Sequence, residues 1–285
     1  MSTSDNYHIR PMTMSEVNDI ALTWAAKEGW NPGLHDAISF YNTDPTGFLI
    51  GLLDDEPIAC LSAVAYDSSF GFLGFYIVKQ EYRGKGYGMK IWNEAMKYLG
   101  DRNISLDGVI DQIANYEKSG FKLAYNNLRY EGISRHSAES FPEILPLSEF
   151  TIDEILSYDS IHFPVPRRNF LRSWLRENES LAIGAKHDGK LAGYSVIRKC
   201  GIGYKTGPLF ADSPELAREL FQSVNNFIEV GAPIFLDTPE PNKEALALAE
   251  SYGMKKVFGT ARMYTQAQPD LDINRVFGVS SFELG

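Results

Sequence analysis

Hydrophobic and polar residues along the first half of the chain follow patterns that predict helices and then strands. Residues 18–30 carry apolar side chains at helical spacing, and residues 35–42 form a second, shorter helical pattern that an Asp-Pro dipeptide ends. Residues 47–53 and 57–66 are apolar runs, and the acidic turn between them is typical of a β-hairpin. The pattern therefore predicts a helix pair followed by two antiparallel strands.

The next segments predict a central strand, a loop and an amphipathic helix. Residues 71–78 are apolar on both faces, which is typical of a strand inside a sheet. A glycine-rich loop follows, and after it apolar residues three and four positions apart predict a helix that Gly100 ends. The rest of this half is predicted as strand, short helix and strand, at 103–110, 115–120 and 121–130. We expect an α+β fold with a mixed, mostly antiparallel sheet flanked by helices.

The second half of the chain repeats this plan at a constant offset of 133 residues, the distance from Gly51 to Gly184. Eight positions in two separate segments are identical at this offset: Ile50/Ile183, Gly51/Gly184, Asp55/Asp188, Ala59/Ala192, Ser62/Ser195, Gly120/Gly253, Lys122/Lys255 and Arg129/Arg262. One register shared by two segments indicates a duplication, and two unrelated α/β segments with similar turns are the alternative. We predict domains at residues 1–135 and 146–285, because the stretch at 134–146 is polar and punctuated by prolines.

Composition and charge limit the class of protein. The chain has 285 residues, of which 44% are hydrophobic, so two modest domains can each bury a core. A net charge of −10 disfavours a dedicated nucleic-acid binder, because such a surface has to neutralise phosphates. The opening residues lack the pattern of a signal peptide, and no apolar run approaches the roughly 18 residues that a membrane span needs. We expect a cytoplasmic protein with no nucleic-acid or membrane partner.

Cysteines and histidines give no sign of a metal site. Cys60 and Cys200 are far apart and lack the spacing of a zinc site or a disulfide framework. The five histidines form none of the spacings that bind zinc on a helix. We therefore expect no metal cofactor.

The glycine-rich loop predicts an anion-binding site. Residues 83–90 read RGKGYGMK, so three alternating glycines and three basic residues open the following helix. Glycines let backbone amides approach a ligand, and the positive end of a helix dipole faces the same concavity. The corresponding stretch of the second half, residues 207–220, has no alternating glycines and carries Asp212 in place of the basic residues. The fold therefore does not require the glycines, which favours a phosphate- or pyrophosphate-binding role.

Two familiar phosphate-binding loops fit this stretch poorly. The P-loop pattern GxxxxGK[ST] is absent. A dinucleotide-binding fold needs GxGxxG, whereas this loop reads GxGxG from Gly84. Asp107 is placed where a ribose-binding acid would stand, but the loop follows a third strand of antiparallel character. The dinucleotide fold is therefore disfavoured.

The loop does match the pattern [Q/R]-x-x-G-x-[G/A], from Arg83 to Gly88, and NYEKSGF follows at 115–121. In these two motifs the chain resembles the GNAT acyltransferase superfamily, and the resemblance covers the whole first half. With its altered second half, the chain looks like two-domain bacterial acetyltransferases that pair a GNAT domain with a YitH/HolE-type C-terminal domain.

The resemblance implies acetyl-CoA as the acyl donor. The pyrophosphate would bind the backbone amides of residues 84–88, and the pantetheine arm would pair with backbone exposed where two central strands splay apart. The donor-binding residues implied are Ile77, Val78, Lys79, Arg83, Gly84, Lys85, Gly86, Tyr87 and Gly88. Tyr116 corresponds to the tyrosine that protonates the departing thiolate, although an ordinary aromatic residue of a short helix is the alternative. The second half has Ala249 at the equivalent position.

Amine attack on a thioester requires a neutral amine, a donor for the oxyanion and a proton for the thiolate. A backbone amide near Val78 and the Tyr116 hydroxyl would supply the last two. Many GNAT enzymes place a glutamate on the strand before the loop, but residues 71–78 contain no carboxylate. The candidates for the general base are Glu28, Asp111 or a chain of water molecules. Glu28 stands near two tryptophans and a histidine, where partial burial would make it a better base.

We expect the protein to transfer an acetyl group to a primary amine of a small molecule or peptide, by direct attack in a ternary complex. A non-catalytic acyl-CoA-binding or sensing protein on the same fold is the alternative. The second half is expected to cover or complete the acceptor site, or to bind a regulator. Four arginines at helical spacing there are expected on a solvated helix face, with an anion-binding site as the alternative: Arg167, Arg168, Arg172 and Arg176.

Overall fold

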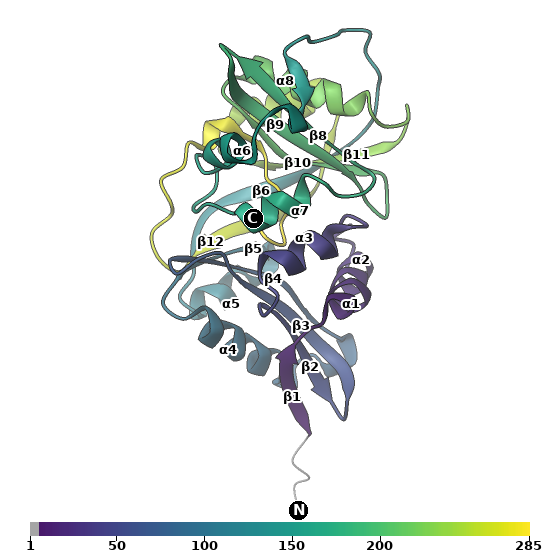
Figure 1. Ribbon diagram of the computed structural model, residues 1–285. Helices are drawn as coiled ribbons and strands as arrows, with labels where there is room; N and C mark the ends of the chain where they lie inside the picture. The colour runs from purple at the N-terminus through teal and green to yellow at the C-terminus, as the bar shows by residue number, and fades with distance from the viewer. Residues whose placement is uncertain (1–5) are drawn as a thin grey trace, which may run out of the picture.

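The computed structural model describes residues 6–285, and its two halves stack along the long axis of the molecule (Figure 1). The strands of the N-terminal half are β1 (Tyr7–Pro11), β2 (Phe48–Leu53), β3 (Glu56–Ala65), β4 (Phe70–Val78), β5 (Asn103–Val109) and β6 (Lys122–Ile133). Its helical segments are α1 (Met14–Glu16), η1 (Val17–Leu22), α2 (Thr23–Lys27), α3 (Asp36–Thr43), η2 (Gln80–Tyr82), α4 (Tyr87–Leu99), η3 (Ile110–Gln112) and α5 (Ile113–Lys118).

The C-terminal half follows the same plan. Its strands are β7 (Ile144–Pro146), β8 (Ser180–His187), β9 (Lys190–Lys199), β10 (Tyr204–Ala211), β11 (Pro233–Pro239), β12 (Lys255–Tyr264) and β13 (Val276–Gly278). Its helical segments are η4 (Leu147–Glu149), α6 (Ile152–Asp159), α7 (Arg168–Trp174), α8 (Pro214–Asn225), α9 (Lys243–Ser251) and η5 (Ile273–Arg275). The α+β fold with mixed, mostly antiparallel pairing is confirmed, since among the paired strands only β4–β5 and β10–β11 run parallel in the described chain.

Local sequence explains most element boundaries. Asp54 and Asp55 both adopt positive φ angles of 50° and 66°, which suits the tight turn between β2 and β3. Ser213 caps α8 through the amide of Leu216, and a proline opens that helix as its sequence predicts. Strand β1 was not predicted, and the first helical region begins at Met14, earlier than expected, behind a capping box of Thr13 and Glu16.

The two halves exchange their last strands. The strand order through the middle of the sheet is β5-β12-β6-β11, so β12 lies between two strands of the N-terminal half. Strand β6 in turn lies between two strands of the C-terminal half. Thirteen strands of the described chain thus form one continuous sheet.

Two buried ion pairs connect the exchanged strands. Arg129 of β6 donates two hydrogen bonds to Asp237 of β11, each at 2.7 Å. Arg262 of β12 donates to Asp107 of β5 at 2.9 and 2.6 Å. The two arginines are equivalent positions of the repeat, so the duplication has placed one bidentate pair on each side of the exchange. Asp107 is therefore a structural partner of Arg262 rather than a ribose-binding acid.

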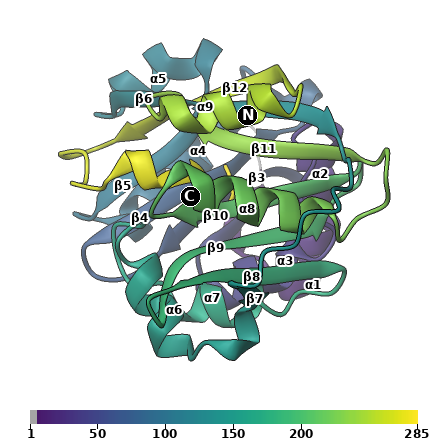
Figure 2. The same cartoon turned by 90° about the horizontal axis from the view of Figure 1, so that it is seen from above.

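The helices lie on two faces of the sheet. Helices α4 and α5 lie at the lower left in Figure 1, across the strands from α1, α2 and α3, whereas α8 and α9 cover the C-terminal half from above, as Figure 2 shows. Helices α3 and α7 meet between the halves, where Phe40 stacks on Trp174 at 6.0 Å between ring centroids. The largest core cluster therefore lies between the halves, and the predicted phosphate-loop helix α4 lies outside it.

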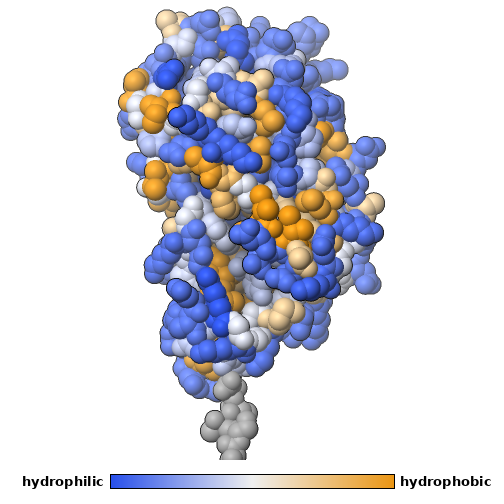
Figure 3. Space-filling model, turned by 180° about the vertical axis from the view of Figure 1, so that it is seen from behind, coloured by the Kyte–Doolittle hydropathy of each residue, from blue (hydrophilic) through white to orange (hydrophobic). Residues whose placement is uncertain are grey.

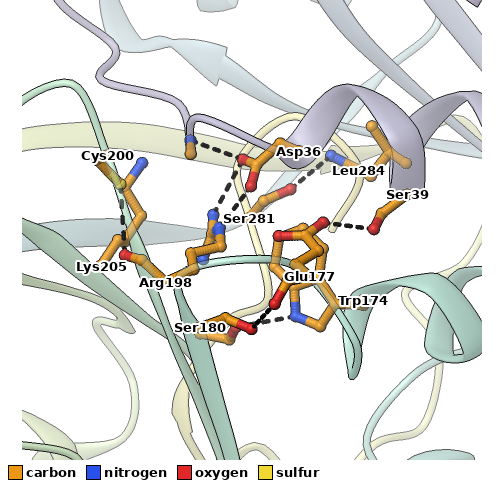
Figure 4. A network of polar contacts seen from close by, with 12 residues as sticks. Asp36, Ser39, Trp174, Glu177, Ser180, Arg198, Cys200, Lys205, Ser281 and Leu284 are labelled. Carbon is orange, nitrogen blue, oxygen red and sulfur yellow. Dashed lines mark hydrogen bonds and ion pairs between the residues drawn. The ribbon is translucent and has the colours of Figure 1, made fainter. Parts of the chain in front are cut away.

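Polar groups are also buried between the halves (Figure 4). Asp36 of α3 accepts a hydrogen bond from Arg198 of β9 at 2.8 Å and another from the Gly33 amide. Glu177 accepts a hydrogen bond from the Ser39 hydroxyl across the same boundary. Burial and the charge of Asp36 raise the pKa of Glu177 to about 8.

The predicted solvated face of arginines is wrong for one of its members. Arg167 is completely buried and donates two hydrogen bonds to Asp159, at 2.9 and 2.8 Å. Its guanidinium also stacks on Phe163, 4.1 Å from the ring centroid. A short helix with Phe170 on the same side turns this arginine inward, while Arg172 and Arg176 stay exposed.

The last ten residues, 276–285, form a completely buried segment that we call the final segment. Its carbonyl groups pass directly over two glycines at equivalent positions of the repeat. A Cβ atom at Gly207 would lie 2.5 Å from the carbonyl oxygen of Val279, and one at Gly74 would lie 2.2 Å from that of Glu283. The final segment therefore crosses from the C-terminal half to the N-terminal half, and side chains at either glycine would displace it.

From behind, most of the surface is hydrophilic, and apolar residues gather near the middle of the molecule (Figure 3). None of the helices in residues 6–285 is long and apolar enough to cross a membrane.

The substitution Asp107→Asn should destabilise both halves together. It leaves the buried Arg262 guanidinium without a counter-charge, so we expect the free energy of unfolding to fall by about 3 kcal/mol. Urea unfolding followed by tryptophan fluorescence measures the loss, and the shared sheet predicts one transition. Asp153→Asn, which breaks an exposed pair with Arg168, is the control and should cost no more than about 0.5 kcal/mol. Two separate transitions would contradict the shared sheet.

The substitution Glu177→Gln should stabilise the protein at alkaline pH. Folding raises the pKa of this carboxyl group from 4.5 to about 8, so the native state holds the proton more tightly than the unfolded chain. The free energy of unfolding of the wild type therefore falls as the pH rises from about 4.5 to about 8. The variant lacks this loss, and we expect it to exceed the wild type by about 2 kcal/mol at pH 8, with little difference near pH 5. Urea midpoints at both pH values measure the effect, and equal midpoints at pH 8 would contradict it.

Candidate functional site

The central strands β4 and β5 separate halfway along their length. They pair in parallel from Phe70 to Leu73 of β4, and within the described chain no pairing joins the rest of β4 to β5. At the point of separation Phe75 has a positive φ of 48°, and the register of β4 against β3 shifts. Ile77 and Val78 remain paired with β3. This bulge turns the end of β4 away from β5, so a V-shaped opening forms between the two strands.

The equivalent opening of the C-terminal half is closed by the chain itself. Strand β10 pairs with β11 only from Tyr204 to Thr206. Beyond that point β13 pairs with β10 at Leu209 and Phe210, and the amide of Val279 donates to the Asp237 carbonyl of β11 at 2.9 Å. An extended ligand cannot pair with strands whose edges are already occupied. The two halves therefore share one architecture, but only the N-terminal half of the described chain has an open cleft between its parallel strands.

The glycine-rich loop lies between the end of β4 and the start of α4. Gly84 and Gly86 have φ angles of 74° and 88°, and in residues 6–285 no heavy atom of a residue outside the adjoining backbone lies within 4 Å of the position that a Cβ would take at either. Left-handed backbone of this kind favours glycine, and the open space leaves room for a ligand. Gly88 differs, because a Cβ there would lie 2.7 Å from the Tyr76 hydroxyl. Two glycines thus shape the loop, and the third lets α4 pack against β4.

Basic side chains surround the loop, and several are already engaged. Arg83 donates to the Val78 carbonyl at 2.8 Å and to the Glu28 carboxylate at 2.6 Å. Lys85 lies over the ring of Tyr82, with its nitrogen 5.4 Å from the centroid. These contacts fix the loop to the end of β4 and to the helix pair. The positive charge remains at the surface, where an anion can approach the first turn of α4.

Tyr116 of α5 lies over the open part of β5. Its ring is so close to Gly108 that a Cβ there would lie 2.2 Å from a ring carbon. The ring also stacks on Trp92 of α4 at 5.9 Å between centroids. Burial, with the neighbouring Tyr76, raises the pKa of Tyr116 to about 12, so the hydroxyl stays protonated at neutral pH. The structure thus brings Tyr116 to the same cleft as the loop.

The sequence did not single out Tyr76, which lies on the same side of the cleft. Its hydroxyl is next to Gly88, its ring lies 5.3 Å from that of Trp92, and burial raises its pKa. Tyr76 was not predicted as a cleft residue because it stands in the apolar sequence of β4, where a tyrosine looks like a core aromatic residue.

The two carboxylate candidates for the general base both lie at the surface. Glu28 is not buried, because its side chain is 39% exposed and pairs with Arg83. Asp111 is exposed in η3, just after β5. In residues 6–285 no group of three or more histidine, cysteine or acidic residues could hold a metal ion. Neither carboxylate is buried in the cleft in the way that a base with a perturbed environment would be.

Comparisons with known proteins agree with this geometry. Residues 15–121 match the model of the acetyltransferase (GNAT) family, and residues 155–278 match that of a second acetyltransferase (GNAT) domain. The holothin acyltransferase of Pseudoalteromonas sp. (strain SANK 73390) is 28% identical over 285 residues, covering 100% of this chain and 97% of its own. The uncharacterized N-acetyltransferase YitH of Bacillus subtilis (strain 168) is 25% identical over 154 residues, or 52% of this chain and 54% of its own.

Solved structures share the fold over nearly the full length. A putative acetyltransferase from Pyrococcus horikoshii has a TM-score of 0.83 at 21% identity and covers 98% of this chain and 96% of its own. A tandem GNAT protein from the clavulanic acid biosynthesis pathway has a TM-score of 0.64 at 12% identity, with 92% and 100% covered. The chain therefore has a tandem GNAT fold. With a GNAT model matched in each half, it belongs to the GNAT acyltransferase superfamily.

Proposed function

We propose that the N-terminal half transfers an acetyl group from acetyl-CoA to a primary amine of a small molecule or peptide. The observation that supports this most strongly is the open cleft of β4 and β5, with the glycine loop at one end and Tyr116 over β5. The full-length relative named as a holothin acyltransferase supports acyl transfer as well. The GNAT family uses acyl-CoA as its donor, and the loop suits a pyrophosphate group.

The donor would lie along the cleft. Backbone amides from Gly84 to Gly88 would bind the pyrophosphate, with Arg83 and Lys85 at its rim. The pantetheine arm would extend beside the backbone of Ile77, Val78 and Lys79, on the edge that β5 leaves open. The Lys79 amide already donates to the Ile58 carbonyl of β3 at 2.9 Å, so the opposite edge of β4 is the one available.

Direct attack in a ternary complex then needs few groups. The amine nitrogen attacks the thioester carbon, a backbone amide near Val78 stabilises the oxyanion, and Tyr116 gives its proton to the thiolate. The ion pair of Glu28 with Arg83 favours a role in holding the loop. Asp111 remains a candidate for the general base, acting from the surface through water molecules. A non-catalytic acyl-CoA-binding protein on the same fold is the alternative function.

The substitution Gly86→Val should weaken acetyl-CoA binding. Valine is strained at a φ of 88° and its side chain would fill the space left open at the start of α4, so we expect the dissociation constant to rise by about tenfold or more. Isothermal titration measures it, and the closed cleft of the C-terminal half predicts one molecule per wild-type chain. Gly253→Val, at a φ of 70° with open space in the other half, is the control for strain. Two molecules bound per chain would contradict the single cleft.

The substitution Tyr116→Phe separates the enzyme from a binding protein. Removing the hydroxyl removes the proton donor, so we expect kcat to fall by about 100-fold while the affinity for acetyl-CoA changes little. Release of the CoA thiol in the presence of a panel of primary amines measures turnover. Tyr98→Phe, which removes a hydroxyl outside the cleft, is the control. A wild type that acylates no amine of the panel while binding acetyl-CoA would favour the binding protein.

A further inference from the structure

The final segment brings an acidic residue to the point where β4 leaves β5. The carbonyl oxygen of Glu283 lies against Gly74, immediately before the bulge at Phe75. A Cβ at Gly74 would also lie 3.0 Å from the hydroxyl oxygen of Ser62 on the neighbouring strand. This glycine therefore leaves room for the final segment at the apex of the open cleft.

The final segment approaches the cleft from the face opposite to Tyr116. Phe282 and Leu284 pack in the core cluster that contains Phe75 and Ile77. Tyr116 packs in the other cluster of this half, with α4. An acyl group held in the opening between β4 and β5 would thus have the Tyr116 hydroxyl on one side and the final segment on the other.

Glu283 has a buried carboxyl group that is incompletely bonded. The residue is 3% exposed, and in the described chain its Oε2 atom has no hydrogen-bond partner. Burying a carboxylate oxygen without a partner costs free energy, so such an atom calls for a bound water, ion or ligand, or for a catalytic role. The hydroxyl of Ser62, beside Gly74, is also buried without a partner. The Ser62 hydroxyl and the Glu283 backbone carbonyl thus lie at the apex, and the Glu283 carboxyl group lies near Arg129 and Lys205.

The charges around Glu283 are unusual for a core. Arg129 and Lys205 both attract its carboxylate, and Lys205 is completely buried with one long hydrogen bond, at 3.4 Å to the Trp30 carbonyl. The same carbonyl accepts a hydrogen bond from Arg129 at 2.6 Å. Burial lowers the pKa of Lys205. Asp237 already satisfies Arg129 through two bonds, so Glu283 is not needed to neutralise that arginine.

We propose that Glu283 binds the acceptor amine and takes its proton, which makes it the general base of the reaction. The nitrogen forms its bond to the thioester carbon as one of its protons passes to the Glu283 carboxylate. The carbon–sulfur bond then breaks, and Tyr116 gives its proton to the thiolate sulfur. The products are an amide and the free thiol of CoA, and proton exchange with water restores both side chains. This assignment rests on the proposed acyltransferase function.

The substitution Glu283→Gln tests the assignment, because it keeps the size of the side chain and removes the base. For an amine that the wild type acylates, we expect kcat/KM to fall at least about 100-fold. The acetyl-CoA dissociation constant should stay within about twofold, and the urea midpoint should not fall. Ser280→Ala is the matched control, since it removes another buried, unpartnered polar group of the final segment without touching the carboxylate. It should retain wild-type kinetics.

Other outcomes overturn the assignment in distinguishable ways. If Glu283→Gln keeps full kcat/KM, Glu283 is not the base, and the acyltransferase function is unaffected. If the variant loses activity only in proportion to a lowered urea midpoint, the carboxylate is a structural partner of Lys205 instead. If the wild type acylates no primary amine, the proposed function fails and this assignment fails with it. Glu283→Asp adds a positive check, since a shortened base should recover part of the lost kcat/KM without changing acetyl-CoA affinity.

Discussion

Two buried arginine–aspartate pairs hold the exchanged strands in place at the centre of the sheet. Arg129 and Arg262 each reach from one half to an aspartate of the other, and each pair is bidentate. A charge inside the sheet is tolerated only with such a partner, so each arginine specifies which strand lies beside it. The exchange therefore has a single register, and neither half can complete its sheet without the other.

The two copies of the fold differ in the cleft beside their central parallel strands. Both copies keep the glycine at the bulge, Gly74 and Gly207, and both strands separate from their parallel neighbour there. In the C-terminal copy β13 fills the opening, whereas in the N-terminal copy it stays open towards α4 and α5. The final segment connects the two clefts. Its first residues close the cleft of the C-terminal half, and its last residues reach the apex of the N-terminal cleft. The C-terminal half thus contributes backbone to the apex of the N-terminal cleft.

Much of the fold could be predicted from periodicity and turn residues. The strands before and after the acidic hairpin, the central strand and helix α4 all appear where their patterns place them. Strand β1 was missed because YHIRP has neither strict alternation nor an apolar run. Arg167 was misjudged because its spacing resembles a solvated face, while its burial depends on Asp159 and two aromatic rings that fold around it. The glycine loop was found from its alternating glycines and basic residues, whereas Tyr116 was found through a family resemblance, since spacing alone left it an ordinary aromatic residue.

The local elements, the duplication and the glycine loop can be read from the chain, because each is encoded in residues close together or in a repeated register. Folding alone establishes which strands cross between the halves, which cleft stays open and where Glu283 lies. These features depend on contacts between residues from about 40 to more than 200 positions apart, and a short segment such as SSFEL carries no local signal of its destination. Burial and charge pairing choose among such contacts, and they act only once the chain has closed on itself.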